Sequence, residues 1–380
     1  MNREPLTLDN FNWTPGLFII GYHVALAIGL PFYFYYSPPG LGIVLTALVL
    51  LFLTEIGIGG AYHRFYSHRC YTLSRPAELI LLFLGTLAIQ GSVLRWSYDH
   101  RLHHTYVDTD KDPYCIHKGF WYAHMLWIFT KPKPIDEKRV PDLLANPLVV
   151  FQHKYAGALS ILSNLAVALV AGWVFSDMLG AFVVVWWLRL LVSHHFTWFI
   201  NSLAHYWGER TYSKEHTAVD NFVIAILTVG EGYHNYHHTF PSDYRNGVLW
   251  YHFDPTKWTI WTFSKLGMAG NLRRFRNYKI KKRLLFEDRK LLMHNLRTRA
   301  YAKNEELEAR TEALAKRLQE KLNQVGALGD QLDRMKSSGA ELSSRRALRR
   351  EIKELTRSMR SDWQDWSQLC GLVLDAAPAA

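Results

Sequence analysis

Residues 41–60, LGIVLTALVLLFLTEIGIGG, decide the fold, because about twenty almost uncharged apolar residues can cross a membrane as one helix. Three further stretches have the same character, at about 15–36, 157–176 and 180–201. Four such runs are difficult to place in the core of a large soluble enzyme. We therefore predict an all-α integral membrane protein with four transmembrane helices.

The connections between these stretches predict how the helices pair. SPPG at 37–40 joins the first two and DML at 177–179 joins the last two, and neither carries a Lys or Arg. The loop 61–155 and the chain after 203 hold nearly all the basic residues. Basic residues favour the cytoplasmic side, so we expect two hairpins with both termini in the cytoplasm. The shorter apolar run 78–95 is interpreted as a re-entrant or interfacial segment that leaves this orientation unchanged.

Composition excludes other classes of protein. Hydrophobic residues make up 49% of the 380 and aromatic residues 14%, which argues against intrinsic disorder. The three cysteines, Cys70, Cys115 and Cys370, are too few and too scattered for a disulfide scaffold, and they fit a reducing compartment. The formal net charge is +11, and the charged residues gather after position 270.

That gathering of charge predicts a boundary between a membrane domain, 1–270, and a basic linker with a helical cytoplasmic tail, 271–380. We expect the basic stretch NLRRFRNYKIKKRLL to meet the membrane surface. Leucine spacing predicts helices at 300–325 and about 340–370, interrupted by GALG and KSSG. The tail is then either a coiled-coil-like hairpin or a solvated helical tail without a specific partner. The first alternative would allow self-association.

Nine of the eighteen histidines fall in four tight groups at the cytoplasmic ends of the predicted spans. Positions i, i+3 and i+4 share one helix face, so the two HxxHH groups predict imidazoles that converge on one metal or on a close pair of metals. His63 and His68 are five residues apart, so we expect their helix to end or bend between them. The four groups are His63 and His68; His100, His103 and His104; His205, preceded by Asn201; and His234, His237 and His238.

The chemistry of these groups favours a pair of redox-active ions. Nine imidazoles exceed the needs of one ion, so two metals are the simplest interpretation. A structural zinc site usually includes cysteine, and no cysteine lies within a group. Imidazole also suits iron, which we expect here. His194 and His195 lie within the fourth span and are left out of the metal site.

Three of these segments resemble the histidine boxes of membrane fatty acid desaturases: HRFYSH at 63–68, DHRLHH at 99–104 and EGYHNYHHTFP at 231–241. The similarity is closest to the acyl-CoA Δ9 (stearoyl-CoA type) branch. NSLAH at 201–205 resembles the additional ligand motif of this branch. It covers about residues 10–265. The resemblance implies two non-haem iron ions held by the nine histidines, with Asn201 acting through water, and O2 as the oxidant.

The resemblance also implies residues that bend the acyl chain beside the metals. Gln90, Trp96 and Thr197 stand at the matching positions, followed by Trp198, although packing roles are the simpler alternative for the tryptophan and threonine. Asp99 precedes His100 and is expected to orient it. Basic residues near the boxes are candidates to bind the phosphate of CoA or of a lipid substrate, or to contact anionic membrane lipid. They are Arg95, Arg101, Lys111 and Lys118.

The expected activity is an O2-dependent desaturation that places a cis double bond near carbon nine of a saturated acyl chain. Acyl-CoA is the expected substrate, and a phospholipid-linked chain, a carrier-protein thioester or hydroxylation on the same platform remain alternatives. A metal transporter and a non-catalytic membrane scaffold are more distant alternatives.

The sequence has no HPGG-type haem segment, cluster-binding Cys motif or GxGxxG, so we expect a separate electron donor of ferredoxin or flavin reductase type. We expect a bacterial inner-membrane protein without a nucleic-acid partner.

Overall fold

The computed structural model describes residues 6–298 and 304–374. The chain divides into two compact units, Met1–Thr211 with Glu215–Arg274, and Tyr212–Lys214 with Phe275–Ala380. Nearly all regular structure in the described residues is helical. The exception is a short antiparallel pair of strands, β1 (Thr72–Leu73) and β2 (Ala269–Gly270).

Four helical segments of the first unit are long and apolar enough to cross a membrane, which confirms the four predicted spans. The second and fourth segments are each built from consecutive helical elements. The segments are α1 (Trp13–Tyr36); α2 (Leu41–Ile56) continued by the π-helix η1 (Gly57–Ser67); α7 (Pro147–Val174); and α8 (Met178–Gly180), the π-helix η5 (Ala181–Leu188), α9 (Arg189–Asn201) and the 3-10 turn η6 (Leu203–His205).

The fifth apolar run forms a helix that is too short to cross. α3 (Arg75–Thr86) is followed by a turn at 87–92 and then by α4 (Val93–Tyr106), which begins at the side-chain cap of Ser92. Because α3 has 12 residues, it reaches only about 18 Å along its axis. It packs on α2 and η1 inside the unit.

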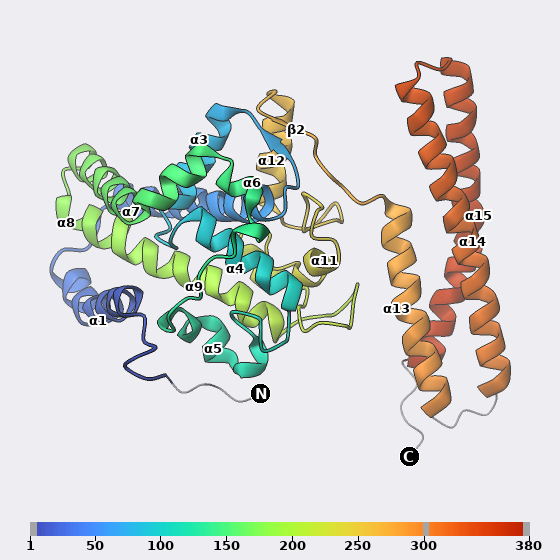
Figure 1. The fold of residues 1–380 in the computed structure, drawn as a ribbon, viewed down its shortest axis with the longest axis horizontal. Helices are drawn as coiled ribbons and strands as arrows, with labels where there is room; N and C mark the ends of the chain where they lie inside the picture. Colours follow the sequence, from blue (N-terminus) through green and yellow to red (C-terminus); the bar gives the residue numbers. More distant parts are fainter. Residues whose placement is uncertain (1–5, 299–303, 375–380) are drawn as a thin grey trace. The chain divides into compact units, whose positions relative to one another are not determined.

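The remaining elements of this unit are short. In Figure 1, α4, α5 and α11 lie around one end of the unit, away from the α7–α8 turn. The short elements are η2 (Ile116–Lys118), α5 (Phe120–His124), η3 (Leu126–Phe129), η4 (Glu137–Arg139), α6 (Pro141–Leu144), α10 (Phe222–Leu227), α11 (His234–Thr239) and α12 (Pro255–Lys265).

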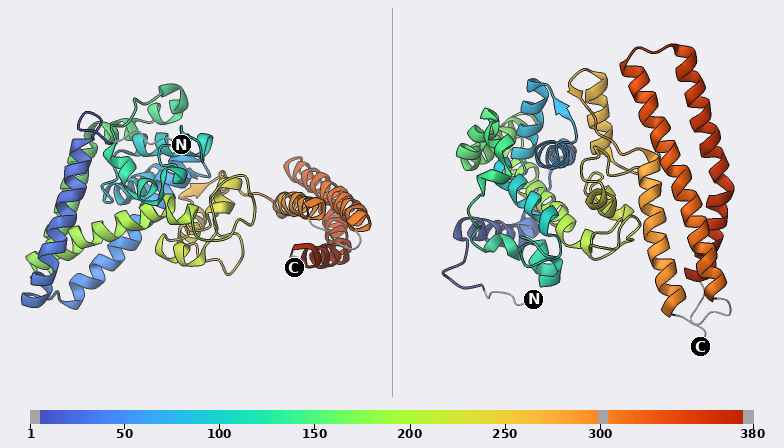
Figure 2. Two further views of the ribbon diagram at one scale, coloured as in Figure 1. Left: turned by 90° about the horizontal axis from the view of Figure 1, so that it is seen from below. Right: turned by 45° about the vertical axis from the view of Figure 1, so that its right-hand side comes forward.

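The second unit is built from three helices that run side by side, α13 (Asn277–Thr298), α14 (Asn304–Ser337) and α15 (Leu342–Leu374) (Figure 2). The sequence predicts only two helices here, and the stretch that forms α13 is expected only as a basic segment. Residues 300–303 of the first predicted helix lie outside the described residues. The apolar core of this unit includes Leu292, Leu318 and Trp366.

The predicted interruption at GALG is wrong, because α14 continues through it to Ser337. A Cβ at Gly326 would lie 2.8 Å from the ring of Tyr278 on α13. The glycine therefore gives room for an aromatic ring of the neighbouring helix, and packing outweighs the cost of about 1 kcal/mol that glycine brings to a helix. The break at KSSG is confirmed, since Gly339 has a φ of +71° after the helix end.

Candidate metal centre

The nine histidines of the sequence motifs gather in two groups, each with its ligand atoms within 4.8 Å of one another. All of them are buried or half-buried. One group has five members and the other four: His63, His68, His100, His104 and His237; and His103, His205, His234 and His238.

The Nε2 atoms within each group point at one another. The pairs His63–His237, His68–His100 and His104–His237 are 2.8–2.9 Å apart, and His103–His238 and His234–His238 are 3.2 and 3.1 Å apart. Two imidazoles bound to one ion at about 2.1 Å each have nitrogens roughly 3 Å apart. The donor set therefore fits one ion in each group.

Each HxxHH motif contributes to both groups. On α4, His100 and His104 join the five-histidine group, whereas His103 joins the other. On α11 the division is reversed, since His234 and His238 join the four-histidine group and His237 the five. The three histidines of each motif lie on one broad face of the helix, but the two adjacent ones diverge by about 100° around the axis, so each motif reaches two neighbouring groups, and α4 and α11 together supply both.

The π-helix η1 explains how His63 and His68 meet. Their helix ends at Ser67, so the predicted end does fall between them, but the winding brings the rings together. The N–H of His68 donates to the carbonyl of His63 at 3.2 Å, an i→i−5 bond, and the ring centroids are 5.0 Å apart. With i→i+5 bonding, residues five apart lie nearly above one another.

Buried side chains hold the outer nitrogen of several candidate ligands, as expected around a metal. Nδ1 of His63 lies 2.7 Å from Glu231, and Nδ1 of His103 lies 2.9 Å from Asp112. Nδ1 of His205 lies 2.8 Å from the hydroxyl of Thr217, which in turn donates to Asp108. None of these three partners is predicted from the sequence. EGYHNYHH contains the glutamate, but its contact is with a histidine far away in the sequence.

The predicted contact between Asp99 and His100 is wrong. Asp99 accepts a hydrogen bond from Arg95 at 2.8 Å, and Nδ1 of His100 instead contacts the hydroxyl of Tyr114 at 3.2 Å. Consecutive residues on a helix point in different directions, whereas Arg95 and Asp99 are four apart and share a face.

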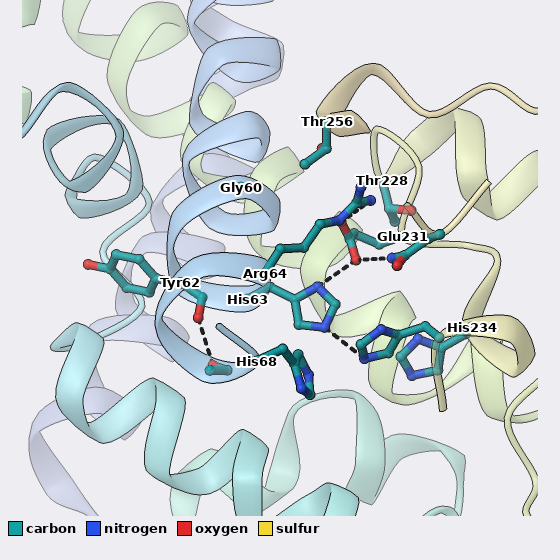
Figure 3. Close-up of polar contacts among 12 residues, drawn as sticks. Gly60, Tyr62, His63, Arg64, His68, Thr228, Glu231, His234 and Thr256 are labelled. Carbon is teal, nitrogen blue, oxygen red and sulfur yellow. Dashed lines mark hydrogen bonds and ion pairs between the residues drawn. The ribbon is translucent and has the colours of Figure 1, made fainter. Parts of the chain in front are cut away.

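Glu231 is fixed by a buried ion network, shown with His63 and Arg64 in Figure 3. Arg64 is fully buried and pairs with Glu231 at 2.8 Å and Asp254 at 3.0 Å. Asn246 donates to the second oxygen of Glu231 at 2.7 Å. Burial alone would raise the pKa of Glu231, but the charge of Arg64 and the hydrogen bond from His63 lower it overall, so the carboxylate stays ionised.

The environment keeps six of the candidate ligands neutral. Burial first, and then repulsion by neighbouring imidazoles, holds the pKa of six of them well below the ordinary value of histidine. A neutral imidazole has the free lone pair that a metal requires. In the four-histidine group, Nε2 of His205 is buried without a hydrogen-bond partner among the described residues. The six are His68, His100, His104, His234, His237 and His238.

A cavity of about 400 Å³ runs beside the histidines and is lined by Gln90, Trp96, Thr197, Trp198 and Asn201. The Gln90 amide donates to the hydroxyl of Thr197 at 2.8 Å, and the indole N–H of Trp96 donates to the Gln90 oxygen at 3.2 Å. The four predicted acyl-chain residues therefore form one wall. Trp96 also stacks on the ring of His100 at 5.1 Å, which brings this wall against the five-histidine group.

Basic side chains also line this cavity, including the predicted Arg95, Lys111 and Lys118. Lys131 and Lys133 line it too and were missed. Arg101 does not line it. Its guanidinium pairs with Asp142 at 2.8 Å and faces a separate open recess of about 450 Å³, which also exposes His68 and His104.

Comparison with known proteins decides the family. A family model described as fatty acid desaturase matches residues 38–269, more than half of the chain and all nine histidines. The chain belongs to the fatty acid desaturase family. The match also contains α2 to α12, and so the candidate metal centre and most of the cavity wall.

Several relatives of this family member carry an activity in their names. A probable acyl-CoA desaturase of Schizosaccharomyces pombe is 38% identical over 77% of this chain and 62% of its own length. Stearoyl-CoA desaturase 5 of Bos taurus is 36% identical over 61% of this chain and 71% of its own. The sn-2 palmitoyl-lipid 9-desaturase of Nostoc sp. is 36% identical over 68% and 88%. The chain spans about 60% of the length of the first fungal relatives that it matches.

Proposed function

We propose that this chain is an O2-dependent desaturase that introduces a cis double bond near carbon nine of a saturated fatty acyl chain, using two iron ions. The observation that carries the proposal is a cavity of about 400 Å³ beside two histidine groups, whose wall contacts the five-histidine group through the stacking of Trp96 on His100. A binding protein would need the cavity and a metal-storage protein would need the histidines, but oxidation of a bound chain needs both.

Ligand roles follow from the geometry. His63, His68, His100, His104 and His237 would hold one iron, and His103, His205, His234 and His238 the other. Asn201, at the cavity wall, is proposed to complete the second site through water. When bound, iron with O2 and two electrons supplies the oxidising power to remove two hydrogens from adjacent methylene groups, which no acid or base of the protein can do.

The protein's own side chains position the substrate. Gln90, Trp96 and Thr197 form a hydrogen-bonded wall that would bend the chain beside the five-histidine group. Glu231 and Asp112 contact Nδ1 of His63 and His103, and in this way would favour the tautomer that leaves Nε2 free to bind an ion.

Acyl-CoA is the proposed form of the substrate. Lys111, Lys118, Lys131 and Lys133 all line the cavity and all lie outside the four candidate spans. A chain carried on a polyanionic, water-soluble head group can enter there, with the head group against the lysines and the chain inside. Names of the relatives include both acyl-CoA and lipid-linked substrates, so a phospholipid carrier is the alternative to be tested.

We further propose that the histidine centre and both termini face the cytoplasm of a bacterial inner membrane, where a separate ferredoxin-type or flavin reductase-type donor supplies electrons. The basis is the charge asymmetry, since the two short connections between spans carry no Lys or Arg. Self-association through the second unit remains a hypothesis.

The test is fatty acid profiling by mass spectrometry after expression in a bacterial host that supplies a ferredoxin system, beside His104→Ala and the control His294→Ala in α13. We expect cis monoenes with the bond at carbon nine from the parent and the control and none from His104→Ala. Hydroxy acids in place of monoenes would show that the enzyme hydroxylates the chain and does not desaturate it. A purified protein without iron would contradict the di-iron proposal. Reconstitution with either stearoyl-CoA or distearoyl phosphatidylcholine then separates the two carriers.

A further inference from the structure

The C-terminal end of α3 is buried among the membrane-spanning helices. Leu87 and Ala88, which follow the last helical residue, are 1% and 0% exposed. The last carbonyls of a helix have no partner within the helix. In an apolar interior such a carbonyl must accept a hydrogen bond from a donor elsewhere, because leaving it unsatisfied costs several kcal/mol of stability.

Side chains of two spans supply those donors. The guanidinium of Arg189 approaches the Leu87 carbonyl at 3.4 Å, and the Asn164 amide donates to the same oxygen at 3.2 Å. Nε2 of His194 lies 2.8 Å from the Ala88 carbonyl. A carbonyl can only accept, so His194 carries its proton on Nε2.

The other contacts of these side chains fix them in turn. Nδ1 of His194 lies 2.8 Å from the hydroxyl of Tyr22 on α1, which must donate to it. Arg189 donates to the hydroxyl of Thr54 on α2 at 3.1 Å and to the Asn164 side chain on α7. Three spans therefore hold the two donors on α9, and the donors hold the chain after α3.

The segment held in this way carries Gln90. Ile89 and Gly91 on either side of it have φ values of +49° and +83°, which is an unfavourable region for isoleucine. Such a backbone persists only where the surroundings enforce it. The side chain of Gln90 then reaches Thr197, three residues after His194 on the same helix. α9 thus anchors the turn twice, once at its backbone and once at its side chain.

We propose that His194 and Arg189 are positioning residues that set where the double bond is placed. They hold the 87–91 turn, and through it Gln90, at a fixed place in the wall of the cavity. The inference rests on the proposed desaturation and adds to it, because it assigns the choice of carbon atoms to backbone contacts outside the metal ligands.

The alternative is that these contacts serve stability alone. In that case their loss lowers the amount of folded protein and the total product, but each folded molecule still oxidises the same carbon atoms. The distribution of double-bond positions among the monoenes separates the two cases, because it is a ratio and does not depend on the amount of active protein.

The experiment compares His194→Phe, which keeps a ring but loses the donor, with His194→Gln, whose amide N–H can take the place of Nε2. We expect His194→Phe to raise the fraction of monoenes with a displaced double bond about tenfold, the effect of losing one well-formed buried hydrogen bond. His194→Gln is expected to restore most of the parental distribution. An unchanged distribution in His194→Phe would overturn the proposal.

Arg189→Lys is the second variant and covers the case in which His194→Phe does not accumulate. It keeps the charge but loses the planar fork that reaches the Leu87 carbonyl and Thr54 together. We expect the same displacement, and a parental distribution would again contradict the inference. Gln90→Ala is expected to displace the double bond by itself. Adding His194→Phe to Gln90→Ala should displace the double bond little further, because both changes act through the side chain of Gln90. Failure of the parent to make any monoene would instead refute the proposed function.

Discussion

Replacing Glu231 with Gln tests whether the buried ion network controls metal binding. Glu231 accepts contacts from His63 at 2.7 Å, Arg64 at 2.8 Å and Asn246 at 2.7 Å. Glutamine keeps the shape but presents one N–H2 group, so one of these donors must face another donor. Loss of an outer-shell carboxylate typically lowers metal affinity 10–100-fold, and we expect a loss in this range at the five-histidine group.

The matched control is Asp254→Asn, because Asp254 pairs with the same arginine, and among the described residues its carboxylate hydrogen-bonds none of the nine candidate ligands. Breaking a buried ion pair lowers the free energy of unfolding by about 3 kcal/mol or more. We expect a loss near 3 kcal/mol in each variant, because the other carboxylate remains beside Arg64. Both variants should therefore be destabilised by a similar amount when unfolding is measured on metal-free protein.

Metal content after dialysis against a graded chelator separates the two variants. We expect Glu231→Gln to release one of two ions at a chelator concentration at least tenfold below that needed for the parent, whereas Asp254→Asn follows the parent. Equal metal loss in both variants would refute the reasoning, since it would show that the ion leaves through general loosening of the network and not through His63.

Three further predictions concern other parts of the chain. Asp112→Asn removes the carboxylate beside His103, so titration with iron should show 10–100-fold weaker binding of one ion, at the four-histidine group, and no change at the other. Thr197→Val removes the acceptor of the glutamine amide in the cavity wall, and product analysis should show a broader distribution of double-bond positions at normal iron content. Gly326→Ala places a methyl group against the ring of Tyr278, and thermal unfolding of the full chain should show a loss of about 1–3 kcal/mol, confined to the second unit.

The four spans and the nine histidines could be read from sequence because each signal is local. A run of twenty apolar residues has few alternatives to a membrane helix, and HxxHH places its histidines by helix geometry alone. The division into two groups could not be read in this way. The spacing predicts that His100, His103 and His104 share a face, but the position of α11 decides which of two ions each one meets.

Residues that support the metal centre were harder to predict because their contacts join distant segments. Glu231 contacts His63 from 168 positions away and Thr217 lies beside Asp108. Asp99 was chosen because it is adjacent to His100, although adjacency along a helix does not bring side chains together. α13 was missed for another reason, since its many charges concealed leucines that pack in the core of the second unit.

The interleaving of the two HxxHH motifs has a consequence for how the centre assembles. α4 gives two histidines to one group and one to the other, and α11 does the reverse, so neither helix can complete a group alone. The remaining ligands come from the ends of two different spans, η1 and η6. The five-histidine group therefore needs the end of the first hairpin, the four-histidine group needs the end of the second, and both need α4 and α11 packed between them. Binding of the two ions together is thus coupled to the tertiary fold of the membrane unit. The same packing closes the cavity wall at Thr197 and Gln90, so the oxidising centre and the site that positions its substrate form together.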